Sequence, residues 1–327
     1  MKYHFTTYFD SIYVLQGITL YRSLKITGID FTLYVACLDQ RAYDIISKLD
    51  EPDIIPIRLD EIEKFDPEFA AVKSNRSIVE YYFTLSPVLP LYIFNKFSGI
   101  DILAYLDSDL YFYSSPQPVY DEFDGKSVLI IEHRFPDELR WREKFGKYNV
   151  QCQLYRNDED ALNCLHWWRK RCIEWCYDRL ESGRFADQKY LDCWPQKFRN
   201  VIVLQHKGAG LAPWNWYAYD LKIHDSITLT VDGEPLIFYH FQGFKPLNRF
   251  MLNHGLGSYH RVMPQHLLRW FYSRYFEELK KTRQQLVIKA GAEDISLYGK
   301  NRRTGFGKLR MIASAVKNRG LMLNSGS

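Results

Sequence analysis

Hydrophobic and polar positions follow two different periods along the first third of the chain. Runs of β-branched, aromatic and aliphatic residues predict strands, whereas apolar positions three and four residues apart predict helices. Strands are predicted over residues 3–8, 31–37, 54–57 and 102–106, and helices over residues 15–24, 41–49 and 77–97, the last broken by Pro87 and Pro90. This alternation favours an α/β fold, with a mostly parallel twisted sheet that carries helices on both faces.

The second part of the chain has shorter predicted strands and longer connections between them. Strands are predicted over residues 128–132, 150–155, 201–204 and 236–240, with residues 227–231 as a hairpin arm. Helical periodicity covers residues 160–180 and 264–281. We therefore expect one α/β domain over residues 1–260, with halves at 1–125 and 126–260, and a helical and basic C-terminal extension over residues 261–327.

Two carboxylates stand at the end of the strand predicted over residues 102–106. Asp107 and Asp109 follow Ile-Leu-Ala-Tyr-Leu and precede Leu-Tyr-Phe-Tyr. Ionised carboxylates are costly to bury unless a cation compensates them, and oxygen ligands suit Mg²⁺ or Mn²⁺. Ligands of parallel sheets also collect at the carboxyl ends of strands. The pair predicts a metal site for a phosphate-bearing substrate; the alternative is a turn that ends the strand.

A second Asp-x-Asp shows that the spacing alone does not identify a metal site. Asp158 and Asp160 follow Asn157 and lead into the helical pattern that begins at residue 160. Acidic residues in a first helical turn interact favourably with the helix dipole, and asparagine is a preferred N-cap. We interpret this segment as a helix start under an Asn157 cap.

The segment that ends the strand over residues 236–240 carries complementary chemistry. His240 closes an apolar run, Gly243 permits a close backbone approach, and Lys245 places a cation just beyond them. An imidazole nitrogen beside two carboxylates suits Mn²⁺, and a lysine ammonium can neutralise a diphosphate. A histidine at a strand end is more often structural when it stands alone, so the prediction depends on the combination.

Together these residues resemble the GT-A glycosyltransferases, most closely the retaining family 8 type, which includes glycogenin-like and bacterial lipopolysaccharide galactosyl- and glucosyltransferases. The resemblance covers most of residues 3–246. It implies that Asp107, Asp109 and His240 bind Mn²⁺ (or Mg²⁺), which holds the diphosphate of a UDP-sugar. It also implies that Ser108, Gly243 and Lys245 contact the donor. The family spaces its glycine and lysine one residue further apart and has tryptophan after the proline, where Leu247 stands here.

The resemblance extends to the nucleoside end of the donor site. It implies that Thr7, Tyr8 and Asp10 cradle the nucleoside, with Tyr8 available for stacking and Asp10 for a polar contact with the base. Arg76 corresponds to an arginine that reaches the donor. The alternatives are a helix cap for Asp10 and an ordinary surface charge for Arg76. The half at residues 1–125 is accordingly the nucleotide-binding half.

Asp187 and Gln188 resemble the Asp-Gln element that faces the donor sugar, and we expect them to hydrogen-bond sugar hydroxyls and stabilise positive charge at the anomeric carbon. A helix N-cap is the alternative for Asp187. In the acceptor half, residues 126–260, Gln151 stands where the family has glycine. His133, Arg134, Trp214 and Asn215 follow predicted strands and are further candidates to line the cleft.

The composition indicates where in the cell we expect the protein. Of 327 residues 46% are hydrophobic and 16% aromatic, no run approaches the ~20 apolar residues of a membrane span, and the start does not resemble a signal peptide. The six cysteines lack zinc-site spacing and suit reduced core thiols. We expect a cytoplasmic protein.

The basic residues are concentrated at the C-terminal end. Residues 296–327 contain seven basic residues and no acid, so the rest of the chain carries a net charge of −3. This distribution argues against nucleic acid as a partner, because a nucleic-acid enzyme has its basic surface around the site. It permits peripheral attachment to the inner membrane face. A solvated tail is the alternative.

The sequence thus predicts a metal-dependent glycosyltransferase that moves a hexose from a nucleotide diphosphate sugar to a hydroxyl group of a carbohydrate or glycolipid acceptor, with retention of anomeric configuration. Two alternatives remain at this point. A sugar-1-phosphate nucleotidyltransferase would carry a glycine-rich loop near its start, where Gly17 stands alone. A carbohydrate-binding protein without catalytic activity would release no UDP from any donor.

Overall fold

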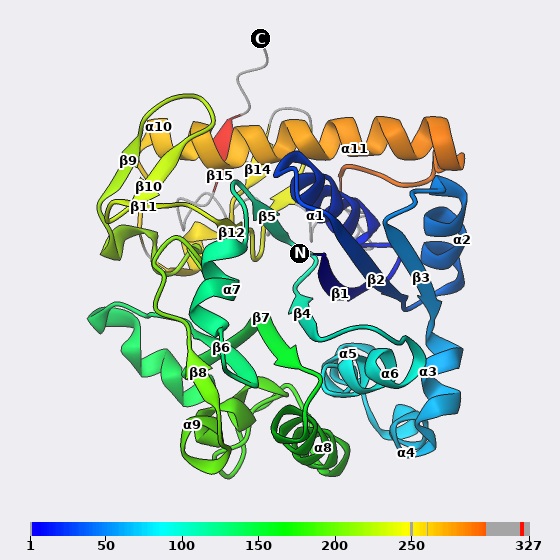
Figure 1. The fold of residues 1–327 in the computed structure, drawn as a ribbon. Helices are drawn as coiled ribbons and strands as arrows, with labels where there is room; N and C mark the ends of the chain where they lie inside the picture. Colours follow the sequence, from blue (N-terminus) through cyan, green and yellow to red (C-terminus); the bar gives the residue numbers. More distant parts are fainter. Residues whose placement is uncertain (1, 249–250, 260, 299–320, 324–327) are drawn as a thin grey trace.

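The structure, a computed structural model, describes residues 2–248, 251–259, 261–298 and 321–323. At its centre is a seven-stranded sheet of order β3-β2-β1-β4-β7-β6-β8 (Figure 1). The strands are β1 (Tyr3–Phe9), β2 (Phe31–Cys37), β3 (Ile54–Arg58), β4 (Ile102–Leu106), β6 (Val128–Glu132), β7 (Tyr148–Arg156) and β8 (Val201–Val203). β7 runs antiparallel to β4 and β6, and the other neighbours pair in parallel. The expected mostly parallel sheet is confirmed.

Both faces of this sheet are covered by helices. In β2, Leu33 and Val35 pack in one core cluster and Tyr34 and Ala36 in another, because successive side chains point to opposite faces. Helices α1 (Val14–Ile26), α2 (Gln40–Leu49) and α7 (Gln117–Phe123) contribute to the first cluster, and α5 (Ile78–Leu85), α6 (Val88–Lys96) and α8 (Glu159–Glu174) to the clusters on the other face. Every residue of β2 and β4 is buried, which explains why β4 is apolar throughout and β2 has Thr32 as its only polar side chain.

The remaining elements are short. The helices α3 (Leu59–Phe65), α4 (Pro67–Ala71) and α9 (Trp194–Lys197) lie between elements of the main fold. β5 (Leu110–Phe112) pairs with β12 (Phe238–His240), and β10 (Leu229–Val231) pairs with β9 (Leu221–Ile223) and β11 (Glu234–Pro235), which confirms the expected hairpin. A third small sheet contains β13 (Lys245–Pro246), β14 (Met251–Asn253) and β15 (Leu321–Leu323).

Three helical predictions need correction or refinement. The pattern over residues 77–97 forms two helices that break at Ser86 and Pro87. The helix predicted over residues 160–180 ends at Glu174. Its N-cap is Asp158, whose carboxylate accepts a hydrogen bond from the Ala161 amide at 2.9 Å, and not Asn157 as expected. The interpretation of this second Asp-x-Asp as a helix start is confirmed.

The C-terminal helical extension packs against the first half of the chain. α10 (Gln265–Leu268), a π-helical turn and α11 (Arg274–Ala290) follow one another, so the helix extends beyond the predicted residue 281. α11 lies across α1 and α2 (Figure 1). The Thr19 and Thr282 hydroxyls hydrogen-bond at 2.9 Å, and Lys289 donates to Glu51 at 2.8 Å.

The predicted basic tail lies almost entirely outside the described residues. All seven of its basic residues fall within residues 299–320, so the expected membrane contact is not addressed by the structure. Within the described part of the chain, none of the helices has the length and apolar character needed to span a bilayer. All six cysteines are free thiols, and five of them are buried.

Candidate active site

A cleft of about 610 Å³ opens at the carboxyl ends of β1 and β4. Tyr8, at the end of β1, and Asp107 to Asp109, directly after β4, line it from the first half of the chain. Gln188, Trp214 and His240 line it from the second half. The volume is within the range of small-molecule sites, and the position is where ligands bind in open α/β sheets.

The strand pairing brings Asp109 and His240 together. A tight turn follows β4, with the Leu110 amide donating to the Asp107 carbonyl at 3.2 Å. β5 begins directly after this turn and pairs antiparallel with β12, in a register that places His240 opposite Leu110. The Phe241 amide then donates to the Asp109 carbonyl at 3.0 Å. Backbone hydrogen bonds therefore hold the imidazole beside both carboxylates.

The three side chains form a compact cluster at the base of the cleft. Nε2 of His240 lies 3.0 Å from Oδ1 of Asp109 and 3.8 Å from Oδ2 of Asp107. The His240 side chain is 4% exposed, whereas Asp107 is 28% and Asp109 19% exposed. The carboxylates therefore remain accessible to a ligand from the cleft, and the imidazole approaches them from the protein side.

The electrostatics of the cluster are unfavourable without a cation. Burial raises the pKa of Asp107 to about 6, although the neighbouring His240 counteracts the shift. Burial alone would lower the pKa of His240, but the Asp109 and Asp107 carboxylates outweigh it and raise that pKa above its ordinary value. Like charges held close together in a buried site favour binding of a cation.

The donor set fits a divalent metal ion. One ligand atom from each of Asp107, Asp109 and His240 lies within 4.8 Å of the others, and among the described residues this is the group of at least three acidic, histidine or cysteine side chains with that geometry. Two carboxylate oxygens and an imidazole nitrogen suit Mn²⁺ or Mg²⁺. Nδ1 of His240 is buried without a hydrogen-bond partner, so a bound water or a small shift is needed to satisfy it.

Asp187 reaches the cleft because α8 ends early. The chain leaves the helix at Trp175 in an extended conformation and returns to the cleft at Asp187. Asp187 precedes a 3₁₀ helix but its side chain caps nothing; the carboxylate accepts a hydrogen bond from Ser86 Oγ at 2.7 Å. Burial raises the pKa of Asp187 to about 7. Gln188 also lines the cleft and donates to the Phe145 carbonyl at 2.9 Å.

Buried hydroxyls connect the two carboxylate positions. The Tyr105 hydroxyl donates to Oδ1 of Asp107 at 2.9 Å. At the other end, Ser86 donates to Asp187 and therefore accepts from the Tyr8 hydroxyl, 3.2 Å away, because a serine hydroxyl has a single proton. The aromatic rings of Tyr8 and Tyr105 lie side by side, with centroids 5.6 Å apart. Sequence reasoning missed Ser86 and Tyr105, which carry no motif.

Several predicted donor-site residues lie elsewhere. The Asp10 carboxylate accepts hydrogen bonds from the Ile12 and Tyr13 amides in the turn before α1, but it does not cap that helix, whose N-cap position is Tyr13. The guanidinium of Arg76 stacks 4.0 Å over the Tyr177 ring and donates to the Ile173 carbonyl at 3.1 Å. Thr7 is buried, its hydroxyl has no hydrogen-bond partner among the described residues, and it is not one of the residues that line the cleft.

The later glycine and lysine differ in their positions. Gly243 lines the cleft with φ +76°, in the left-handed region that glycine adopts without strain, and a Cβ atom there would lie 3.7 Å from Gly255. Lys245 is exposed in β13 and lies outside the residues that line the cleft. Ser108 does line the cleft, as expected.

The wall opposite Tyr8 is aromatic. His133 is stacked on Phe135 with ring centroids 4.6 Å apart, and burial lowers the pKa of His133 to about 4, so this imidazole is neutral. The Trp214 indole donates to the His133 carbonyl at 2.6 Å and lines the cleft. Asn215 is fully buried, and its side-chain amide donates to the His133 and Gly210 carbonyls, each at 3.0 Å. Of the four residues that follow predicted strands and were candidates to line the cleft, His133 and Trp214 do line it.

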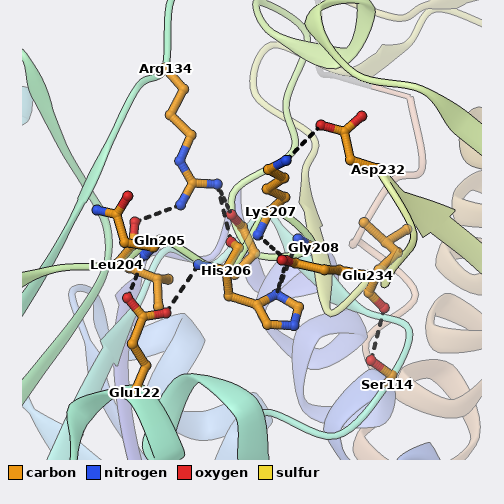
Figure 2. A network of polar contacts seen from close by, with 12 residues as sticks. Ser114, Glu122, Arg134, Leu204, Gln205, His206, Lys207, Gly208, Asp232 and Glu234 are labelled. Carbon is orange, nitrogen blue, oxygen red and sulfur yellow. Dashed lines mark hydrogen bonds and ion pairs between the residues drawn. The ribbon is translucent and has the colours of Figure 1, made fainter.

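Arg134 supports this wall from behind. Its guanidinium donates to the carbonyls of Leu204, Ala209 and His206 at 2.7, 2.9 and 3.2 Å, as Figure 2 shows for Leu204 and His206. Below them in Figure 2, Glu122 of α7 accepts the amides of Gln205 and His206. Hydrogen bonds from Arg134 and to Glu122 thus hold residues 204–209, the segment that leads to Trp214. A Cβ on Gly208 would lie 1.9 Å from the Pro235 carbonyl oxygen, so this position requires glycine.

We expect Arg134→Met to lower the free energy of unfolding by about 2–4 kcal/mol, because three carbonyls lose a charged donor. Thermal unfolding monitored by circular dichroism measures the effect. Arg199→Met is the matched control, since Arg199 is exposed, and it should leave the melting temperature unchanged. Equal melting temperatures of the two variants would contradict the role assigned to Arg134.

Comparison with known proteins places this site in context. No protein-family model matches the sequence. The uncharacterized protein YfnD of Bacillus subtilis (strain 168) is 31% identical over 282 residues, which cover 85% of this chain and 89% of YfnD. The uncharacterized protein YfnF of the same strain is 29% identical over 239 residues, 70% of this chain and 78% of YfnF.

Solved structures show the same fold. The galactosyltransferase LgtC, crystallised with donor and acceptor sugar analogs, superposes with a TM-score of 0.55 at 13% identity, covering 86% of this chain and 96% of LgtC. The apo form of the glycosyltransferase GlyE from Streptococcus pneumoniae TIGR4 has a TM-score of 0.51 at 13% identity, covering 92% of this chain and 66% of GlyE. The GT-A fold that the sequence resemblance implied is confirmed.

Proposed function

The chain belongs to the family of the uncharacterized protein YfnD of Bacillus subtilis and has the GT-A fold, and from this premise we propose that it is a glycosyltransferase. It moves a hexose from a nucleotide diphosphate sugar, with UDP as the nucleotide, to a hydroxyl group of a carbohydrate or glycolipid acceptor. The observation that carries the proposal is the convergence of Asp107, Asp109 and His240 at the base of a cleft of sugar-nucleotide size. The cleft thus offers both the ligands for a metal ion and the volume for a nucleotide-sugar donor.

The metal would be held by the two carboxylates and Nε2 of His240. Bound there, Mn²⁺ (or Mg²⁺) supplies Lewis acidity toward the diphosphate leaving group. The Tyr105 hydroxyl donates to Oδ1 of Asp107 and so orients this carboxylate. The other oxygen, Oδ2, faces His240. The Gly243 backbone lines the cleft without a side chain, which lets a diphosphate approach it closely. Lys245 is too exposed in this conformation to be assigned a contact with the donor.

Asp187 and Gln188 are proposed to steady the sugar. Ser86 holds one oxygen of Asp187, and the Phe145 carbonyl holds the Gln188 amide, so both side chains have a defined orientation at the cleft. In the retaining course that the family resemblance implies, the acceptor oxygen bonds to the anomeric carbon on the face from which the phosphate oxygen leaves. That phosphate oxygen takes the acceptor proton, so no protein nucleophile is required.

The test is a thermal-shift panel of nucleoside diphosphates and their sugars, each with and without Mn²⁺. We expect UDP and its sugars to raise the melting temperature by about 2–5 °C only when Mn²⁺ is present, since a ligand that binds only the folded state stabilises it. A shift that is independent of metal, or no shift with any nucleotide, would overturn the proposal. Release of pyrophosphate from a nucleoside triphosphate and a sugar phosphate would instead identify a nucleotidyltransferase.

A further inference from the structure

A continuous series of ring contacts leads from the proposed metal site to the outer edge of the cleft. The Trp214 ring meets the His240 ring edge-on, with centroids 5.5 Å apart, and lies 5.9 Å from the Tyr259 ring. The guanidinium of Arg142 lies 5.0 Å over the Tyr259 ring. We refer to Trp214, Tyr259 and Arg142, all of which line the cleft, together with the adjoining Trp141 as the aromatic wall.

Trp141 ends this wall at the protein surface. Its side chain is 55% exposed, although tryptophan is among the side chains with most apolar surface to bury. The Arg142 guanidinium and the Lys144 ammonium each lie 4.9 Å from the Trp141 rings. All three residues belong to the 3₁₀ helix Asp137–Phe145, whose end forms part of the cleft. The wall therefore ends in a half-exposed indole with two cations over its rings.

These two cations have no carboxylate partner among the described residues. In the same 3₁₀ helix, Asp137 pairs with Arg140 and Glu138 pairs with Arg261. The remaining acid, Glu143, acts on Lys147, which is ion-paired with Glu132. Arg142 donates only to the Ser258 carbonyl, at 2.9 Å, and its Nε atom is buried without a partner. Among the described residues, neither Arg142 nor Lys144 forms an ion pair.

We propose that the aromatic wall, with Lys144, is the acceptor subsite, and that the acceptor is a saccharide carrying a negatively charged phosphate or carboxylate group. The inference rests on the proposed function, which places the donor diphosphate at the metal cluster and the donor sugar at Asp187 and Gln188, and leaves the aromatic wall for the acceptor. Aromatic faces suit the apolar C–H faces of sugars, and cations favour an anionic ligand over a neutral one. The Trp141 end of the wall lies beyond the transfer point, so the anionic group belongs to a sugar further along the acceptor.

The experiment measures binding of methyl glucoside, methyl glucuronide and glucose 6-phosphate without nucleotide, by isothermal titration calorimetry at low ionic strength. The wild type is expected to bind the two anionic saccharides about 3- to 10-fold more tightly than the neutral one. Arg142→Gln/Lys144→Gln should abolish this preference, and Lys144→Gln, which breaks no hydrogen bond among the described residues, should reduce it. Trp141→Ala should weaken all three equally. The arms with carboxylate and phosphate distinguish the two sources of negative charge.

Lys96→Gln/Arg199→Gln removes the same two charges at exposed positions away from the cleft and should keep the preference. Equal binding of neutral and anionic saccharides by the wild type, no binding of any of them, or a preference that survives in Arg142→Gln/Lys144→Gln would overturn the inference. Stabilisation of the same variants by UDP with Mn²⁺ is measured in parallel. If UDP with Mn²⁺ does not stabilise the wild type, the proposed function is refuted. If this stabilisation is seen but Arg142→Gln/Lys144→Gln keeps the wild-type preference for anionic saccharides, only the acceptor subsite is refuted.

Discussion

Replacing Asp107 with asparagine is expected to reduce sugar transfer by about 10³-fold or more, equivalent to roughly 4 kcal/mol of transition-state stabilisation. Asparagine has the size of aspartate but lacks the charge that a metal ligand supplies here. Because the pKa of Asp107 is already raised to about 6 by burial, the substitution also removes an unfavourable buried charge. The melting temperature without ligand should therefore be kept or increased while metal-dependent stabilisation by UDP disappears.

The chain contains its own control for this substitution. Asp160 is the second acid of the other Asp-x-Asp and lies in the first turn of α8, where it accepts a hydrogen bond from Asn200 at 2.8 Å. Asp160→Asn should leave UDP release from the donor sugar unchanged. If Asp107→Asn retains more than about a tenth of wild-type transfer, or if wild-type transfer resists EDTA, the metal assignment is refuted.

Replacing Asp187 with asparagine is expected to stabilise the folded protein at alkaline pH and to lower sugar transfer. Burial raises the pKa of Asp187 to about 7, so the folded protein holds this proton more tightly than the unfolded chain, whose carboxyl titrates near 3.8. Ionisation of Asp187 therefore costs folding free energy. The cost is absent below pH 3.8, grows as the pH rises toward 7, and is complete above about pH 7, where it is on the order of 2–4 kcal/mol.

Asp187→Asn should accordingly be more stable than the wild type at pH 8, with a much smaller difference at pH 5, in chemical denaturation followed by tryptophan fluorescence. Transfer should fall by about 10²-fold, because the charge beside the anomeric carbon is lost. Asp66→Asn is the matched control. Asp66 is equally buried but accepts two hydrogen bonds from Arg169, so its loss should destabilise the protein at both pH values. A pH-independent effect of Asp187→Asn would show that its carboxyl is not perturbed as described.

Much of the architecture could be predicted from local patterns. The buried strands were evident because a strand covered on both faces needs apolar residues at successive positions, as in β2 and β4. The end of β4 was evident because two carboxylates cannot continue a buried strand. The boundaries were less accurate where tertiary contacts override periodicity. α8 ends at Glu174, and Tyr177, inside the predicted helix, stacks against Arg76, a contact that no local signal indicates.

Only some of the residues of the candidate site could be predicted from the sequence. Asp107, Asp109, His240, Asp187 and Gln188 were found because each stands at the end of a recognisable element or matches a family motif. Ser86, Tyr105 and Arg142 were missed because a hydroxyl or a guanidinium inside an ordinary helical or strand pattern has no distinctive spacing. Lys245, expected at the diphosphate, is exposed in β13 and lies outside the residues that line the cleft, so its contact with the donor stays a prediction.

The sequence by itself determined the α/β character of the protein, the positions of its strands, and the carboxylate pair that ends β4, since burial and backbone periodicity are properties of neighbouring residues. Only the tertiary structure decided that β12 pairs with β5, which places His240 within 3.0 Å of Asp109, and that Arg142 and Trp214, far apart in the sequence, line the same cleft. The physical reason is that such encounters depend on which distant segments pair and pack, and this follows from the free energy of the whole fold and not from the pattern of any one segment.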